Sequence, residues 1–445
     1  MKKLRIFIIL LIAIVPIVCG FVIVDDSLHC DIQYELDGGM NSPENKTRYD
    51  KSNGSFYLQD PEKEGCDFFG WYTSPDFDES TKVTEFDPET MGDVTLYAKF
   101  VAYVEYLGNS VVSITEYGRT KTEIAIPKSC ERIGDYAFEN ATNLTKITTD
   151  GCGNLVEIGI GAFAGCVNLE SVELPASLNK IGIMAFDNKT LKAVKIAEDN
   201  KTFKMVVGSI VRITDNTLIS FGGSDIPRGI EIIGEYALFK NTDIQNVTIP
   251  NTVKEISSHA FANCHNLETV EFEKDSILKV VGEYAFGYCY KVQELNLPEC
   301  VEVISGGAFA NCKLLKAFKF PENIKMKVVE ASTFYGCESL EEINLPSGVE
   351  VIERDAFANC NNLTSIIISE SVKEIDGDAF RDCKNLKSAV LLGGGNWQMK
   401  PFCLAKVDID DHFTTSPTEF ARILSSNDLP ISLGLNAYIR FYLYR

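Results

Sequence analysis

The chain has 445 residues, of which 45% are apolar and 10% aromatic, so it can fold as more than one domain and is not intrinsically disordered. Its formal net charge at pH 7 is −21. Because such a charge repels phosphate groups, we expect neither nucleic acid nor an anionic membrane surface as the main partner.

The N-terminus has the pattern of an export signal. Three basic residues lie among the first five, an uncharged run follows over residues 6–24, and Asp25 ends it. We interpret residues 1–24 as a cleaved signal peptide. An uncleaved N-terminal anchor and a lipidated Cys19 are the alternatives. All three place the rest of the chain at the cell surface or outside the cell, with membrane contact only through this segment if it stays uncleaved.

Residues 30–100 form a first module, which reads as short strands separated by glycine turns, with Trp71 and Tyr72 at the edge of a small core. Its pattern is carried by residues 37–39, 63–72 and 96–100. These segments resemble the Listeria–Bacteroides repeat, although Cys66 replaces a usual aromatic residue. The resemblance implies a small β-grasp-like domain of an exported surface protein. Cys30 and Cys66 share this module and are a candidate disulfide.

A repeat dominates residues 101–392. An Ala-Phe dipeptide recurs at intervals of 23 or 25 residues, and Leu238 and Thr333 fill its two slots by substitution. One wider interval leaves room for an irregular unit between Ala197 and Arg228. A fixed period of this length predicts stacked repeats that share one core, since a single unit cannot bury its own apolar edge.

Each unit of the repeat has three parts. Ile366 and Ile368 show the alternation of a half-buried strand, and Val349 and Ile352 form a second inward edge. The Ala-Phe pair supplies a small residue for a tight turn and a large one to plug the interior. We therefore predict a mainly β solenoid with short helical or irregular turns. The full pattern resembles the BspA-like leucine-rich repeat of microbial surface proteins, repeated ten times.

Seven of the fourteen cysteines occupy one slot of the repeat, three residues after the Phe slot. We expect them to be buried thiols, because other units place Ala141 or Asn241 there and free cysteine packs as a small hydrophobe. Disulfides between neighbouring units, or a bound metal, are the alternatives. The seven are Cys166, Cys264, Cys289, Cys312, Cys337, Cys360 and Cys383.

Residues 393–445 lose the period and are interpreted as a C-terminal cap or tail. A run of three glycines suggests a hinge, a capping box predicts a helix that ends near Leu424, and residues 439–445 read as a strand. A cap of this kind would protect the apolar end of the last unit.

The sequence contains no catalytic, cofactor-binding or metal-binding motif that we recognise, so we expect no enzyme, no cofactor and no metal. The repeat assigns nearly every apolar residue to the core. His259 and His265, which flank the Phe261 plug, are expected to point to solvent.

These observations predict an exported cell-surface protein whose solenoid mediates protein–protein interaction or adhesion, with an extracellular or host-surface protein as partner. A structural spacer without a specific ligand is the alternative. The slots beside the inward residues of each strand vary from unit to unit, so they are the expected contact surface. The candidate ligand-contact residues are Glu271, Asn296, Lys319 and Asn344.

Overall fold

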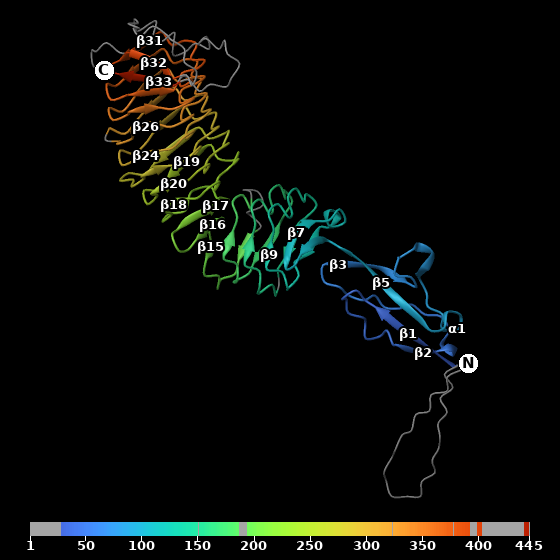
Figure 1. The fold of residues 1–445 in the computed structure, drawn as a ribbon. Coiled ribbons are helices and arrows are strands. Elements are labelled where there is room, and N and C mark those ends of the chain that lie inside the picture. The colour runs from blue at the N-terminus through green and yellow to red at the C-terminus, as the bar shows by residue number, and fades with distance from the viewer. Residues whose placement is uncertain are drawn as a thin grey trace, which may run out of the picture. The chain divides into compact units, whose positions relative to one another are not determined.

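The computed structural model describes residues 28–149, 151–186, 194–322, 324–376, 378–391, 398–402 and 440–444 (Figure 1). The chain divides into two compact units. The first runs through Glu105 and also contains Ile114–Pro127, and the second comprises Tyr106–Ser113 and the chain from Lys128 onward. The predicted signal segment, residues 1–24, lies outside the described residues. None of the helices that the structure describes has the length and hydrophobicity needed to cross a bilayer.

A five-stranded mixed sheet in the order β2-β1-β5-β3-β4 forms the first unit. Strands β1 and β5 are parallel, and the other neighbours are antiparallel. Trp71, Phe86 and Leu96 are buried in its core. The strands are β1 (His29–Glu35), β2 (Arg48–Asp50), β3 (Cys66–Tyr72), β4 (Lys82–Val83) and β5 (Val94–Ala102). The short helices are η2 (Lys51–Asn53), η3 (Glu79–Thr81), α1 (Pro88–Met91) and η4 (Gly118–Thr120).

This unit is larger than the module predicted over residues 30–100. It keeps the chain as far as Glu105 and takes in Ile114–Pro127, a stretch that the repeat pattern assigned to the array. The longest α-helix described here, α1, is a single turn whose N-cap is Asp87. The β-grasp-like arrangement therefore stays a prediction.

The second unit is a stack of coils, each built from one repeat. The strands of a first row alternate inward and outward side chains, and neighbouring strands in this row are parallel. A second row of strands, each two or three residues long, precedes the Ala-Phe turns, and its neighbouring strands are parallel as well. The first-row strands are β10 (Lys146–Thr148), β12 (Ser171–Leu174), β14 (Val194–Ile196), β19 (Asn246–Ile249), β21 (Thr269–Phe272), β23 (Glu294–Asn296), β25 (Ala317–Lys319), β27 (Glu342–Asn344), β29 (Ser365–Ile368) and β31 (Ser388–Leu391). The second-row strands are β9 (Arg132–Ile133), β11 (Glu157–Ile158), β13 (Lys180–Ile181), β18 (Ile232–Ile233), β20 (Glu255–Ile256), β22 (Val280–Val281), β24 (Val303–Ile304), β26 (Val328–Val329), β28 (Val351–Ile352) and β30 (Glu374–Asp376). Strands β6 (Val104–Leu107), β7 (Ser110–Ile114) and β8 (Glu123–Ala125) precede them.

The irregular unit predicted between residues 197 and 228 is an antiparallel meander. It consists of β15 (Phe203–Val206), β16 (Ser209–Arg212) and β17 (Thr217–Ser220), and a bulge interrupts the β16–β17 pairing. Strand β17 then pairs in parallel with β18, so the coil pattern resumes directly after the meander. The prediction of one irregular unit is confirmed.

The interior of the array is filled by stacked phenylalanine rings from the Ala-Phe turns. The rings of Phe286 and Phe309 have centroids 6.1 Å apart, and those of Phe309 and Phe334 lie 5.5 Å apart. The substituted slots pack in the same way, because Leu238 and Thr333 are both buried. The predicted plug role of the Phe slot is therefore confirmed, and each coil depends on the coils beside it for its core.

The end of the chain contributes two more strands, β32 (Gln398–Phe402) and β33 (Arg440–Tyr444). Strand β33 pairs antiparallel with both β30 and β32, which confirms the strand predicted over residues 439–445. It lies along the edge of the last second-row strand. The helix predicted to end near Leu424 lies outside the described residues.

Candidate functional site

The outward side chains of the first-row strands form one surface, which we call the strand face. In β23 the side chains of Glu294 and Asn296 are exposed while Leu295 is buried, and β25 and β27 follow the same pattern. The inward residues of these strands are all large and apolar. The outward ones are Glu and Asn in β23 and β27 but Ala and Lys in β25, so neighbouring coils present different polar surfaces on the same backbone frame.

The structure brings three of the four predicted contact residues together. Asn296 pairs with Lys319 in the register of β23 and β25, and the β25–β27 register places Asn344 beside Lys319. The fourth, Glu271, is also exposed but belongs to β21, which pairs with β19 in a separate two-stranded sheet. Lys319 forms an ion pair with Glu322 at 3.2 Å. Further along this face, the exposed Ile367 is the only large apolar residue in an outward slot that the structure describes.

On the turn side, the seven repeat cysteines form a thiol ladder. All seven are buried free thiols, as predicted. Each Sγ donates a hydrogen bond to the carbonyl oxygen of the plug residue one coil earlier, as in Cys312 to Phe286 at 3.3 Å and Cys337 to Phe309 at 3.3 Å. The backbone amide of the same plug residue donates a hydrogen bond to the carbonyl oxygen of the Ala-slot residue in the next coil, as Phe309 does to Thr333 at 3.0 Å. The thiol therefore satisfies a buried carbonyl and has a second role besides packing. The other five bonds are Cys166 to Phe138, Cys264 to Leu238, Cys289 to Phe261, Cys360 to Phe334 and Cys383 to Phe357.

The candidate disulfide between Cys30 and Cys66 is wrong, because both are free thiols in the structure. Strand β5 separates β1 from β3, so the two cysteines lie on strands about 10 Å apart. They are also close to opposite ends of β5, since Ile32 pairs with Val94 and Cys66 pairs with Ala102. A disulfide requires Cα atoms closer than about 7 Å.

The two repeat histidines do not simply point to solvent. The ring of His259 stacks between those of Tyr236 and Tyr284, with centroid distances of 4.7 and 5.3 Å. His265 stacks on Tyr290 at 4.6 Å. Both histidines thus belong to aromatic stacks that run from coil to coil. The described part of the chain contains no group of three or more His, Cys, Asp or Glu side chains placed to hold a metal ion.

A cavity of about 740 Å³, which we call the acidic groove, opens along the turn side of the coils from Glu235 to Glu353. Small residues such as Gly282 and Gly306 line it, and the half-buried ring of Tyr284 forms part of its wall. Its five carboxylates belong to Glu235, Glu255, Glu283, Glu330 and Glu353. This groove was not predicted, because acidic residues occur throughout the chain and do not mark any one site.

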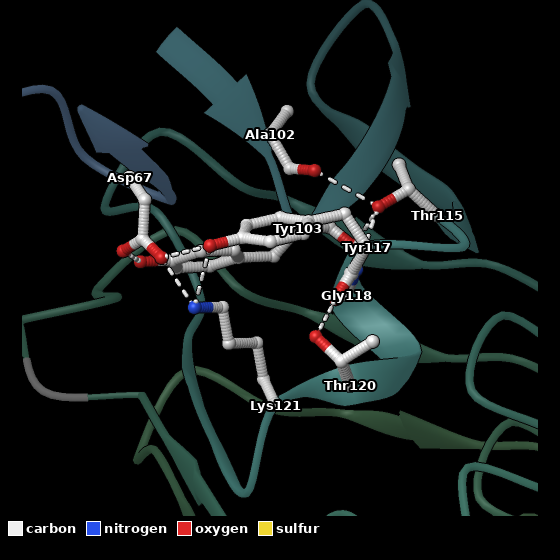
Figure 2. A network of polar contacts seen from close by, with 8 residues as sticks. All are labelled: Asp67, Ala102, Tyr103, Thr115, Tyr117, Gly118, Thr120 and Lys121. Carbon is white, nitrogen blue, oxygen red and sulfur yellow. Dashed lines mark hydrogen bonds and ion pairs between the residues drawn. The ribbon is translucent and has the colours of Figure 1, made fainter. Parts of the chain in front are cut away.

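A second feature that the sequence did not predict is a polar network around Asp67 in the first unit. Figure 2 shows the Asp67 carboxylate, on β3, facing three side chains that come from later in the chain. It accepts hydrogen bonds from the hydroxyls of Tyr103 and Tyr117 and from Nζ of Lys121. Lys121 also donates to the Tyr117 hydroxyl at 2.9 Å, and its Nζ lies 4.4 Å from the centre of that ring.

The backbone around this network is equally constrained. The Thr115 hydroxyl donates to the carbonyl of Ala102 at 2.9 Å and accepts from the Gly118 amide at 2.9 Å (Figure 2). A Cβ on Gly118 would lie 1.9 Å from the carbonyl oxygen of Tyr103, so only glycine fits at this position. These contacts fix residues 115–121 within the first unit.

The charges of the network are held in their ionised forms. Burial alone would raise the pKa of the Asp67 carboxyl, but the hydrogen bonds from Lys121, Tyr103 and Tyr117 outweigh it and lower that pKa to about 2. The Asp67 carboxylate in turn raises the pKa of the Lys121 ammonium. Neither group can exchange a proton readily at neutral pH, which favours a structural role over acid–base catalysis.

Replacing Asp67 by Asn should lower the free energy of unfolding of the first unit by about 1–2 kcal/mol, a value reduced because a third of the side chain is exposed to solvent. The folded pKa lies below the ordinary value of 3.8, so this contribution is complete above about pH 4 and is lost as the pH falls towards 2. Urea unfolding at pH 6 and pH 3 measures it. The exposed Asp60→Asn variant is the control, and equal losses in the two variants would contradict the role of the network.

Comparison with known protein families agrees with the coil architecture. A model of the BspA type leucine rich repeat region matches residues 108–207, 216–327 and 315–414, which is more than half of the chain. The chain belongs to the BspA-type leucine-rich repeat family. A second model, the Listeria-Bacteroides repeat domain, matches residues 31–99 and covers most of the five-stranded sheet. No catalytic family is among these matches.

Several solved structures are similar to this BspA-type chain. The pneumococcal vaccine antigen PcpA is 24% identical with a TM-score of 0.45, over 62% of this chain and 64% of that one. A leucine-rich cell surface protein from Faecalibacterium prausnitzii is 26% identical with a TM-score of 0.35, over 61% and 60%. A leucine-rich repeat protein from Bacteroides ovatus is 20% identical with a TM-score of 0.38, over 78% and 97%. The BspA-type chain thus spans less than two thirds of the first two proteins. A search of curated proteins gives no match.

Proposed function

We propose that this chain is an exported, non-catalytic cell-surface protein whose repeat array binds another protein, either on a host or on a neighbouring cell. The family supports a role in protein interaction, and the N-terminal sequence pattern supports export. The observation that carries the proposal is the strand face. Its backbone repeats from coil to coil while its outward side chains change, which is the arrangement that lets a repeat protein recognise one partner along an extended surface.

Asn296, Lys319 and Asn344 provide the centre of the proposed contact. Their three coils span about 10 Å of the array, and Glu271 extends the patch by one further coil. Four residues are too few for a complete interface, which usually takes about 20–30 residues on each side. We therefore expect the partner to cover several coils, with these residues near the middle of the contact.

Replacing Glu271, Asn296, Lys319 and Asn344 together by Ala should weaken partner binding and leave the fold intact. All four side chains are exposed, and exposed substitutions usually change stability by less than about 0.5 kcal/mol each. The measurement is capture of surface proteins by the chain from residue 30 onward, followed by the affinity of the captured partner for wild type and variant.

The matched control is the double variant Lys313→Ala with Glu338→Ala. Like the fourfold variant, it removes one basic and one acidic residue from the array. These two side chains form an ion pair at 2.9 Å and lie outside the strand face. If the wild type captures no protein, the spacer interpretation replaces the binding one. If a captured partner binds both variants equally well, the contact lies elsewhere on the array.

A further inference from the structure

The negative charge of the acidic groove is local and is not simply a consequence of the net charge of the chain. Directly before the second-row strands, acidic and basic residues of neighbouring coils form ion pairs. Glu231 pairs with Lys254 at 2.5 Å, and Glu302 pairs with Lys279 at 2.6 Å. Glu350 lies between two lysines in the same way. Among the described residues, no lysine or arginine lines the groove or forms an ion pair with any of its five glutamates.

The five carboxylates fall into two groups. Those of Glu330 and Glu353 accept the backbone amides of Gly306 and Ala331, and that of Glu255 accepts the Ser257 hydroxyl at 2.6 Å. These three serve the protein's own structure. The other two belong to Glu235 and Glu283, which are exposed and form neither an ion pair nor a side-chain hydrogen bond within the described chain. They are two coils apart, which corresponds to about 10 Å along the groove.

An aromatic wall lies beside these two carboxylates. Each of the two glutamates is followed directly in the sequence by a tyrosine, Tyr236 or Tyr284. The ring of His259 is stacked between the two tyrosine rings. Tyr284 faces the cavity. Its position is fixed by the next coil, because a Cβ on Gly307 would lie 2.6 Å from the ring. Both faces of the Tyr284 ring are therefore covered, one by His259 and the other by the coil that holds Gly307. The attraction for lysine and arginine side chains comes from the two carboxylates, and the ring shapes the wall beside them.

The dimensions of the groove favour an extended chain over a small ion. It runs over the coils from Glu235 to Glu353, which at about 5 Å per coil gives a length of roughly 25 Å. An extended peptide advances about 3.3 Å per residue, so seven or eight residues would fill this length. Every second side chain of such a peptide points to the same side, so alternate residues lie about 6.6 Å apart. Lysine and arginine side chains are long enough for two of them at this spacing to reach Glu235 and Glu283.

We propose that the acidic groove binds an extended lysine- or arginine-rich segment of a partner protein. This site is made by elements other than the strand face, so it can exist whether or not the strand face is the main contact. It gives the array a second surface with its own chemical preference, one that selects partners by positive charge.

The test is binding of a fluorescent octapeptide of alternating lysine and serine to the full chain at low salt. The double variant Glu235→Gln with Glu283→Gln should bind this peptide about tenfold more weakly. The control is Glu170→Gln with Glu341→Gln, which removes the same charge from two exposed positions outside both the groove and the strand-face contact residues and should change the affinity less than twofold.

Equal weakening by the two double variants would show attraction by net charge alone and would overturn the proposal. So would an unchanged affinity in the groove variant, or no binding of the peptide to the wild type. Thermal melts check that every variant is folded. Failure of the strand-face proposal appears separately, as unchanged capture by the Ala variant, because the octapeptide experiment does not depend on those residues.

Discussion

Replacing Phe309 by Ala should lower the free energy of unfolding of the repeat array by about 3–5 kcal/mol. The side chain is fully buried, and its ring contacts those of Phe286, Phe318 and Phe334. Ala would leave a cavity bounded by the two neighbouring coils. The flanking coils cannot close it without giving up their own stacking, so most of the lost contact energy is not recovered.

Urea unfolding followed by circular dichroism measures this loss. The control is Leu314→Ala in the same coil, because that side chain is 43% exposed and its removal should change stability by less than about 0.5 kcal/mol. Since each coil contacts mainly its neighbours, amide hydrogen exchange should accelerate most in the coils around Phe309. Coincident unfolding curves for wild type and Phe309→Ala would contradict the inward position of the ring.

The seven ladder thiols should not react with a maleimide in the folded protein and should all react after denaturation. Reaction requires an exposed thiolate, whereas these thiols are enclosed and donate their protons to backbone carbonyls. Burial raises the pKa of the Cys312 thiol to about 12 and raises those of Cys289 and Cys337 well above their ordinary value of 9.0. At neutral pH these three thiols therefore stay protonated.

Mass-spectrometric mapping of the modified cysteines makes this measurement specific. Cys66 and Cys300 are only partly buried and serve as internal references that should react before the ladder. Denaturation without a reducing agent should release all seven thiols. If they stay unreactive under that condition, the ladder is oxidised and disulfides replace the free thiols described here.

The coil architecture could be predicted from the sequence because its signals are local and repeated. The alternation at Ile366 and Ile368 and the fixed spacing of the Ala-Phe pair both lie within one unit, and stacking follows from the need to bury the apolar edge. The same pattern located the strand face. The strand face is divided into separate sheets, and Glu271 lies in a different sheet from the other three contact residues. This division depends on hydrogen bonds between coils, which the repeat spacing does not predict.

The predictions that failed needed information about distant parts of the chain. The Cys30–Cys66 pairing assumed proximity within a small domain, and strand order decides otherwise. The Asp67 network joins residues 36 to 54 positions apart, with no motif to connect them. The groove could not be predicted from the sequence, because the chain has 63 acidic residues. Only the folded coils show which of these carboxylates lack a basic neighbour.

The hydrogen bonds at the Phe slot also bear on how such a gene can change in length. At seven junctions a coil offers its successor the amide and the carbonyl of its plug residue, and the successor provides an Ala-slot carbonyl and a thiol. Duplication or loss of a whole coil would therefore leave each new junction chemically the same as the old ones. A shorter insertion inside a coil would displace the thiol from its carbonyl and the ring from its stack. Recombination between repeats is thus tolerated in steps of one coil, and arrays of many lengths can arise without redesign of any junction.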